Sequence, residues 1–377
     1  MAFGGQGGRL MKGPLKLLHL TRDHPPMSKG GLSIAVSWLA ELGLHAGHQV
    51  TVVSFDSWRP QRNPQPEAPA LSREALGPGL ELVRLTATGQ LAELTEMLQS
   101  IHIDWVHVHH GTLWPYAAYI QAPKMLCVHV LQAELNRVRA VPTTWSASAQ
   151  LEALDAADII QLSTVETAQL ALEHHPQIAS RLRILPMDTT LTAQAQRDHR
   201  GRNVVTVGRF DVSKGTADFI ALSQALTDCE VIDGATILGG VPGNSKAERR
   251  WGRQIAPLPQ LKWTGWLAHQ HMARILGQAG VALFASHAET LGLGVLEAMS
   301  LGVPVVATDV SGHRSLIGDN ERGVLVPVGA IEQMKTACVE LFKEPDIAQK
   351  MGQRAADWVA EERPKWRRSW VDFWSTS

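Results

Sequence analysis

Residues 287–307 read HAETLGLGVLEAMSLGVPVVA, and this stretch decides the fold. A short apolar run at 281–285 precedes it, a helical pattern covers 294–301, and a second apolar run follows at 305–308. Strand, glycine-containing loop, helix and strand in this order predict one unit of an α/β fold with a parallel sheet.

The same alternation continues on both sides of this unit. In the second half, strands are expected at 204–207, 235–238 and 261–263, and helices at 217–226, 246–255 and 272–279. In the first half, strands are expected at 16–20, 49–55, 82–85, 105–109, 125–129, 158–162 and 183–185, and helices at 32–46, 91–101, 147–156 and 165–174. Each half is therefore predicted to be Rossmann-like, and the fold class is α/β.

Two polar segments interrupt the alternation. The segment at 58–69 contains too many prolines for a core strand and indicates a surface loop. Between 186 and 202 the apolar periodicity disappears, which indicates a linker. We therefore expect an N-terminal domain over 1–188 and a C-terminal domain over 200–364, which face each other across a central cleft at the carboxyl ends of their strands.

The last segment, about 347–373, has a helical pattern in which Trp366, Trp370 and Trp374 recur every four residues. Residues four apart share one face of a helix, so the three rings form a stripe. Such a stripe is typical of a packing seam, and the alternatives are contacts with a partner or a membrane. We expect residues 365–377 to cross back and pack on the N-terminal domain.

The charges of the chain are balanced. Lys and Arg number 35 and Asp and Glu 36, and residues 1–190 carry 14 basic and 16 acidic groups against 21 and 20 in the remainder. Binding to nucleic acid or to an anionic membrane needs a clustered cationic surface, and this balance gives no indication of one. With 45% hydrophobic residues, the composition is that of a folded globular protein.

The cysteines and the first residues bear on the compartment. Cys127, Cys229 and Cys338 have no metal-ligand spacing, and we expect reduced, buried thiols. The start, MAFGGQGGRLMKG, lacks the apolar run of a signal peptide, and no stretch approaches the roughly 18 apolar residues of a membrane span. The expected location is the cytoplasm.

The junction between the expected strand at 281–285 and the following helix predicts a phosphate site. Gly292 and Gly294 let the backbone approach an oxygen closely, and the first N–H groups of a helix have no partner within it. Glu289 lies just outside this helix start and Glu297 about one turn inside it. Carboxylates accept hydrogen bonds from hydroxyls, which favours a sugar on one side of the phosphate and a ribose on the other.

A second motif, VGRFDVSKG at 207–215, supplies positive charge. The expected strand ends at Gly208, and the loop after it carries Arg209 and Lys214. Two cations at the carboxyl end of a strand match a diphosphate, because Arg forms forked contacts and Lys provides a point charge. A surface loop with two solvated charges is the alternative interpretation.

These two motifs, in this order and about 80 residues apart, resemble the basic diphosphate loop and the E-x7-E motif of the retaining GT-B glycosyltransferases of family 4. Residues 28–54, SKGGLSIAVSWLAELGLHAGHQVTVVS, resemble the glycine loop, first helix and second strand of that family. RPKWRRSWVDFW at 363–374 resembles its terminal helix, which crosses between the domains. The resemblance covers nearly the whole chain and implies the GT-B fold.

The resemblance implies an activity and the roles of charged residues. A sugar would move from a nucleotide-diphosphate sugar, a UDP- or GDP-sugar, to an acceptor hydroxyl with retention of the anomeric configuration. Arg209 and Lys214 would neutralise the diphosphate. Glu297 would hold the ribose hydroxyls, and Glu289 would contact the transferred sugar.

Backbone groups complete the donor site in this family. The resemblance implies that the backbone groups of five residues contact the phosphates: Gly30, Gly31, Leu291, Gly292 and Leu293. It implies that the backbone of Gly265 lies at the edge of the base. His129, at the end of an expected strand, would face the reacting sugar, and a purely structural histidine is the alternative. His109 and His110, at another strand end, are candidates for the acceptor site.

The chain contains no Asp-x-Asp, the pattern by which the other large transferase fold holds a divalent metal. We therefore expect a reaction without a metal or another cofactor. The acceptor, a small molecule or a glycan, would be recognised by loops at 56–80 and 110–116.

The chain departs from the family pattern at several positions. It reads ILPMDTT where relatives have Pro-Asn-Gly, so no role falls on Met187 or Asp188. Leu291 stands where an aromatic residue is common, and Gly294 where a branched residue is common. Two other functions stay open. One is a transferase-like binding subunit without catalysis. The other is an NAD-dependent oxidoreductase, although GLG at 292–294 lacks the third glycine of a dinucleotide motif.

Overall fold

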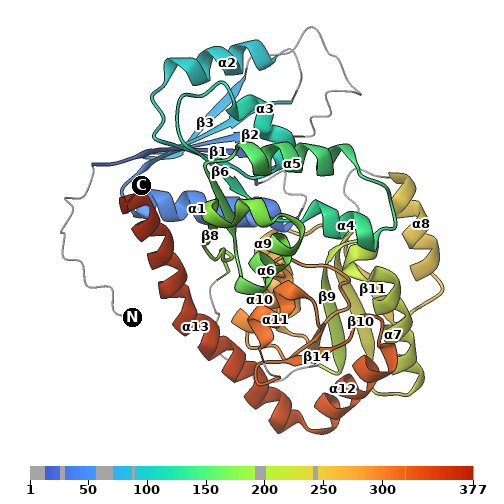
Figure 1. Cartoon of the computed structure of the whole chain (residues 1–377). Helices are drawn as coiled ribbons and strands as arrows, with labels where there is room; N and C mark the ends of the chain where they lie inside the picture. The colour runs from blue at the N-terminus through green and yellow to red at the C-terminus, as the bar shows by residue number, and fades with distance from the viewer. Residues whose placement is uncertain are drawn as a thin grey trace.

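The computed structural model describes residues 13–25, 30–56, 71–86, 90–191, 201–240, 245–318 and 320–376. The Pro-rich segment at 58–69 and residues 192–200 of the expected linker lie outside the described residues. Figure 1 shows two lobes, each a sheet packed with helices, one above the other. The last helix runs along both lobes.

The first sheet has eight strands in the order β3-β4-β2-β1-β5-β6-β7-β8. Neighbouring strands of this sheet are parallel, except that β3 pairs antiparallel with β4 at the edge. The strands are β1 (Lys16–Thr21), β2 (Gln49–Ser54), β3 (Ser72–Gly77), β4 (Leu80–Arg84), β5 (Trp105–Val108), β6 (Lys124–Cys127), β7 (Ile159–Leu162) and β8 (Leu182–Ile184).

The helices of this half are α1 (Gly31–His45), α2 (Leu91–Ser100), α3 (Trp114–Ala117), α4 (Gln132–Val138), α5 (Trp145–Ala156) and α6 (Val165–His174). Three short elements of this half, β3, α3 and α4, were not predicted, and neither were α11 (Ser311–Ile317), β14 (Val324–Val326) and α12 (Ile331–Lys343) of the second half. The reason is plainest for β3, whose residues are nearly all exposed, so that no apolar pattern marks the strand. The first sheet is consequently mixed rather than wholly parallel.

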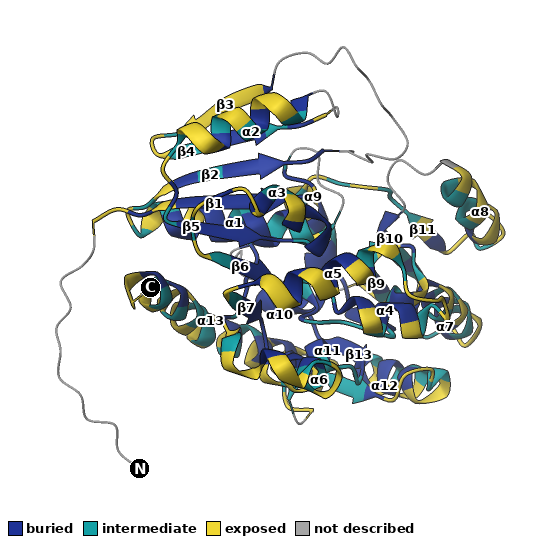
Figure 2. Cartoon of the chain, turned by 45° about the horizontal axis from the view of Figure 1, so that its top comes forward, coloured by how far each residue is buried: buried dark blue, intermediate teal, exposed yellow. Residues whose placement is uncertain are grey.

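The second sheet has six parallel strands in the order β11-β10-β9-β12-β13-β14. The strands are β9 (Asn203–Arg209), β10 (Gly234–Gly240), β11 (Leu261–Trp263), β12 (Val281–Phe284), β13 (Val305–Thr308) and β14 (Val324–Val326). The helices are α7 (Thr216–Asp228), α8 (Ser245–Ile255), α9 (His269–Gly277), α10 (Leu293–Ser300), α11 (Ser311–Ile317), α12 (Ile331–Lys343) and α13 (Pro345–Thr376). β12 and β13 are buried throughout, as expected for central strands with helices on both faces. In the first sheet, β1 and β2 are also mostly buried (Figure 2).

Helix α13 joins the two halves. It is 32 residues long, or about 48 Å, and runs from the second half to the first sheet (Figure 1). Trp370 and Trp374 near its end are fully buried. The indole N–H of Trp370 donates to the carbonyl of Pro186 at 2.8 Å, and that of Trp374 donates to Nε2 of His107 at 3.3 Å. The tryptophan stripe therefore packs on protein.

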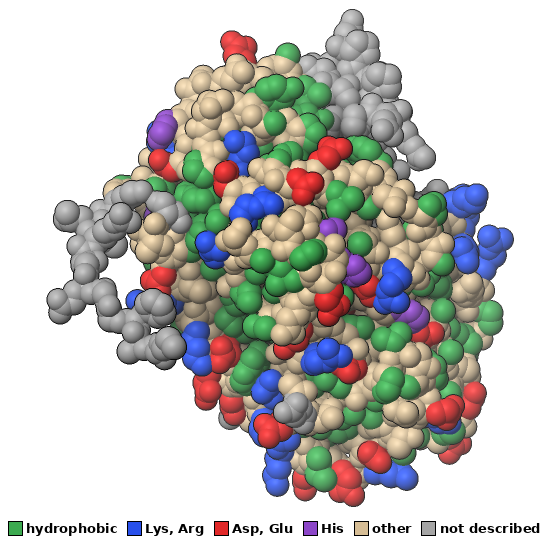
Figure 3. Space-filling model, in the orientation of Figure 1, with side chains coloured by type: hydrophobic (Ala, Val, Ile, Leu, Met, Phe, Trp, Pro, Cys, Tyr) green, Lys and Arg blue, Asp and Glu red, His purple; other side chains and the backbone are tan. Residues whose placement is uncertain are grey.

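The surface mixes both signs of charge on the face drawn in Figure 3. Lys and Arg gather at α8, where Lys246, Arg249, Arg250 and Arg253 are exposed.

Of the three cysteines, Cys127 and Cys338 are buried. Cys229 is exposed because it follows the last turn of α7, which corrects the expectation of three buried thiols. None of the described helices is both long and apolar enough to span a bilayer.

Replacing Trp374 with alanine should lower the free energy of unfolding by about 3–5 kcal/mol, because a fully buried ring and its hydrogen bond are lost. Urea unfolding followed by circular dichroism measures the change. Trp366→Ala, on the same stripe but only partly buried, is the matched control and should cost clearly less. Equal losses in the two variants would contradict the packing role of the Trp374 ring.

Candidate functional site

The loop that carries Lys214 is shaped by its neighbours. Asp211 caps a single turn of 3-10 helix, Val212–Lys214, and Gly215 follows with φ of 59°. A Cβ at Gly215 would lie 1.8 Å from the carbonyl oxygen of Ala285, the residue after β12. Only glycine permits this approach, so the loop after β9 lies directly against the carboxyl end of β12.

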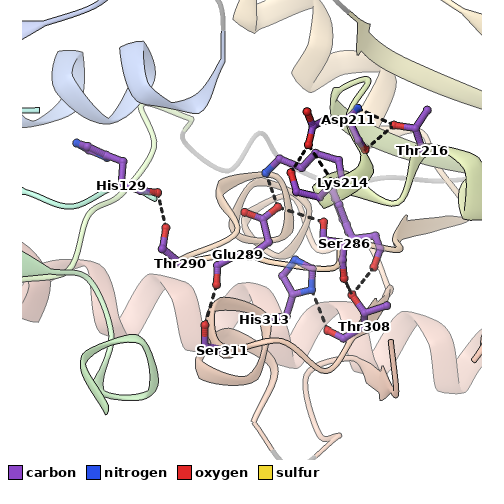
Figure 4. A network of polar contacts seen from close by, with 12 residues as sticks. His129, Asp211, Lys214, Thr216, Ser286, Glu289, Thr290, Thr308, Ser311 and His313 are labelled. Atoms are coloured by element: carbon purple, nitrogen blue, oxygen red, sulfur yellow. Dashed lines mark hydrogen bonds and ion pairs between the residues drawn. The ribbon is translucent and has the colours of Figure 1, made fainter. Parts of the chain in front are cut away.

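This approach brings Lys214 to Glu289. Nζ of Lys214 lies 2.5 Å from Oε1 of Glu289, and the hydroxyl of Ser286 donates to the same oxygen at 3.1 Å (Figure 4). Burial alone would raise the pKa of Glu289, but the charges of Lys214 and His313 and the hydrogen bonds from Lys214 and Ser286 hold that pKa below its usual value. The carboxylate is therefore ionised at neutral pH.

The start of α10 faces the same loop. Gly292 precedes the helix with φ of 84°, and a Cβ there would lie 2.8 Å from the ring of His313. A Cβ at Gly294 would lie 2.8 Å from the ring of Phe284, so this glycine lets α10 pack closely on β12. The first N–H groups of α10, which begins at Leu293, have no partner within the helix and can bind an anion.

Two glycines of the first half lie opposite these groups. A Cβ built at Gly30 would be 3.9 Å from Cδ and Nε of Arg209, an exposed residue at the end of β9. A Cβ at Gly31 would be 2.9 Å from the side chain of Leu293. The structure thus brings the predicted glycine loop to the predicted diphosphate cation and to the start of α10.

Glu297 is more enclosed than Glu289. It lies in α10 and is 4% exposed, and its Oε1 is 2.7 Å from Nε2 of His269 and accepts a hydrogen bond from the hydroxyl of Thr189 at 3.1 Å. Sequence reasoning missed both partners. Thr189 lies in the expected linker and His269 begins α9, so no local signal connects either residue with Glu297.

The remaining donor-site residues sit at two loops. Leu291 is buried, and its backbone packs against Gly312 at the start of α11. Gly265 follows β11 with φ of 69°, and a Cβ there would meet no atom within 4 Å. Its carbonyl accepts a hydrogen bond from the N–H of Gly239 at 3.0 Å. Gly265 therefore faces open space at the end of β11.

Thr290 links the two halves beside Glu289. Its hydroxyl donates to the carbonyl of His129 (Figure 4). Its own carbonyl accepts a hydrogen bond from Thr167 at 2.7 Å. The motif that contains Thr290 was recognised, but this residue was not singled out. A threonine beside a glutamate has no sequence signature of a contact across two domains.

His129 follows β6, and its ring points away from Lys214 and Glu289 (Figure 4). Its Nε2 lies 2.9 Å from Nδ1 of His109, whose Nε2 lies 3.0 Å from Nδ1 of His19. His109 is 1% exposed and enclosed by these two rings, so this candidate for the acceptor site does not face an acceptor. Nε2 of His110 instead lies 3.3 Å from Nη1 of Arg22.

Among the side chains that the structure describes, no three of His, Cys, Asp and Glu are grouped so as to hold a metal ion.

Residues 188–358 match the family model described as "Glycosyl transferases group 1". The alpha-D-kanosaminyltransferase of Streptomyces kanamyceticus is 29% identical over 157 residues, which are 41% of this chain and 39% of that protein. The 2-deoxystreptamine N-acetyl-D-glucosaminyltransferase of Streptomyces fradiae is 27% identical over 258 residues, 62% of this chain and 61% of that protein. Each match thus spans less than two thirds of the relative's length.

Solved structures match the whole fold. Sucrose-phosphate synthase from Thermosynechococcus elongatus superposes with a TM-score of 0.79 at 19% identity, covering 96% of this chain and 98% of that one. Anabaena HepE in complex with UDP-glucose superposes with a TM-score of 0.72 at 16% identity, covering 96% and 100%. The chain therefore has the GT-B fold. Both predicted motifs, at 207–215 and 287–307, lie within the residues that the family model covers.

The buried histidines of this GT-B protein should make it sensitive to acid. Burial lowers the pKa of His129 to about 4 and of His107 to about 3. Between pH 6.5 and these values the unfolded chain binds more protons than the folded one, so stability is complete above about pH 6.5 and is lost as pH falls. The melting temperature should therefore drop steadily from pH 7 to pH 4.

A variant isolates one contribution to this acid sensitivity. His107→Gln removes a titrating ring, so the melting temperature of this variant should decline less steeply over the same pH range. In unfolding free energy, the slope should be smaller by up to about 1.4 kcal/mol per pH unit. An unchanged slope would show that His107 takes up no proton on unfolding.

Proposed function

We propose that this GT-B protein is a retaining glycosyltransferase that moves a sugar from a UDP- or GDP-sugar to an acceptor hydroxyl. One observation carries the proposal: Arg209, Lys214, Glu289 and the start of α10 meet at a single place, opposite the glycine that begins α1. Cations and free N–H groups suit a diphosphate, and an ionised carboxylate beside them suits a sugar.

The main chemical task is to stabilise the leaving group. Breaking the glycosidic bond develops negative charge on the diphosphate, and Arg209, Lys214 and the N–H groups of α10 supply positive potential before the charge appears. Such preorganised donors typically contribute about 2.7 to 4 kcal/mol each.

The ion pair between Lys214 and Glu289 links the groups proposed for the diphosphate and for the sugar. When Lys214 turns to the phosphates, the Glu289 carboxylate is free to accept hydrogen bonds from sugar hydroxyls. Glu297 would take the ribose hydroxyls in the same way, in place of the hydrogen bond from Thr189.

The acceptor would be a small polyhydroxylated molecule or a glycan. Two relatives are named for transfer of N-acetyl-D-glucosamine to 2-deoxystreptamine, which supports an acceptor of this kind. With retention of configuration, the acceptor proton would pass to the departing phosphate. The cytoplasmic location expected from the sequence is part of this proposal.

Replacing Lys214 with alanine should lower turnover of the donor by at least about tenfold, because a cation that stabilises the departing diphosphate is lost. Steady-state kinetics of the purified chain with UDP- and GDP-sugars measures the effect. Lys343→Ala, an exposed lysine at the end of α12, is the matched control and should keep full activity. Normal turnover by the Lys214 variant would refute its role, and binding without turnover in the parent protein would indicate a non-catalytic subunit.

We also propose that the reaction needs no metal, since the chain lacks an Asp-x-Asp pattern and the cations Arg209 and Lys214 can balance the diphosphate. Protein treated with a chelator and assayed in metal-free buffer should retain its activity. Loss of turnover that Mg²⁺ restores would overturn this part of the mechanism.

A further inference from the structure

Four histidines lie together on one face of the first sheet. His107 and His109 are two residues apart and therefore point to the same side of the sheet, and His19 on β1 pairs in register with His107 on β5. The rings of His19 and His107 stack with centroids 4.6 Å apart, and His129 follows the neighbouring strand β6. Such a row of buried imidazoles requires a reason beyond packing, because apolar side chains would fill the same space.

Three of these rings form a hydrogen-bonded chain that runs from the domain boundary into the protein. It begins at His129, continues through His109 and ends at His19, with N···N distances of 2.9 and 3.0 Å. A neutral imidazole carries one proton, so each ring donates through one nitrogen and accepts through the other. Because both nitrogens of His109 are engaged, all the hydrogen bonds of the chain must point in the same direction.

The inner end of the chain sets that direction. Nε2 of His19 is buried and has no partner among the described residues. An orphaned buried N–H is rarer and more costly than an unpaired acceptor, so the proton of His19 belongs on Nδ1. His19 then donates to Nε2 of His109, and His109 donates through Nδ1 to Nε2 of His129. The proton of a neutral His129 is left on Nδ1.

The outer end lies at the domain boundary beside the proposed donor site, and the ring of His129 points away from Lys214 and Glu289 there (Figure 4). The carbonyl of His129 accepts the hydrogen bond from Thr290, the residue after Glu289 (Figure 4). Within the part of the chain that the structure describes, Nδ1 of His129 has no hydrogen-bond partner. Burial also keeps the rings neutral at pH 7, since it lowers the pKa of His129 to about 4 and the pKa values of His109 and His19 as well.

We propose that His109 and His19 are positioning residues that hold His129 in one tautomer, with its proton on Nδ1 available to donate a hydrogen bond to a sugar hydroxyl. The contact with sugar rests on the proposed function, whereas the tautomer rests on the chain of histidines alone. In this arrangement His129 acts as a hydrogen-bond donor and not as a base through Nε2, because that nitrogen already accepts from His109.

The tautomer can be read directly by ¹⁵N NMR of the full chain labelled at histidine, with the His129 signals assigned from His129→Gln. We expect Nδ1 of His129 to be protonated and Nε2 to be unprotonated at pH 7. A protonated Nε2 would overturn the proposal. This measurement needs no substrate, so its failure is distinct from a failure of the proposed function, which would appear as absent turnover.

A matched pair of variants tests the role of His109. The amide N–H of asparagine can replace Nδ1–H and still donate to His129, whereas the longer glutamine places its amide near Nε2 and leaves His129 without its donor. His109→Asn should therefore keep the tautomer and most of the turnover number, and His109→Gln should lose the tautomer preference and lower kcat by about tenfold or more. Equal behaviour of the two variants in both measurements would refute the positioning role.

His107→Gln is the control for burial in the same layer. His107 stacks on His19 but lies outside the hydrogen-bonded chain, so this variant should change the melting temperature and leave the His129 tautomer as in the parent protein. Circular dichroism shows whether each variant is folded. A tautomer change in the control as large as that in His109→Gln would mean that general packing, rather than the chain, sets the proton position.

Discussion

The close contact between Gly215 and the carbonyl of Ala285 is the constraint on which the site depends. β9 and β12 are neighbours in a parallel sheet, so the loops that follow them leave from the same edge. Any side chain at position 215 would force the two loops apart. Without this contact, Lys214 would not reach Glu289, and the cation and the carboxylate would be two separate surface charges.

Much of this arrangement was predictable, because it depends on local patterns. The central strands β12 and β13 are continuous apolar runs, and the glycines that lead into α10 mark a helix start with exposed N–H groups. The prediction failed at several elements with a weak local signal, and it also missed α12, a helix of 13 residues. β3 is a polar strand at the edge of the sheet, and α4 is a helix of only seven residues.

The partners of the site residues could not be predicted for a different reason. Thr189 bonds to Glu297 across 108 residues of sequence, and His19 bonds to His109 across 90. Such pairs exist only after the strands and linkers are placed in space, and neither partner belongs to a motif. The alternation His-Val-His at 107–109 did carry information, since it places two polar rings on one buried face, but their shared hydrogen bonds required the position of His19.

Helix α13 also has a consequence for biosynthesis. Trp370 packs beside His107 of the first sheet. It is translated 184 residues after Pro186, to whose carbonyl it donates a hydrogen bond. At typical elongation rates of about 5–20 residues per second, the ribosome needs about 10 to 40 s to cover that distance. The face of the N-terminal half on which Trp370 and Trp374 pack is therefore not covered by these rings until α13 has been synthesised, and chaperones have this interval in which to bind it.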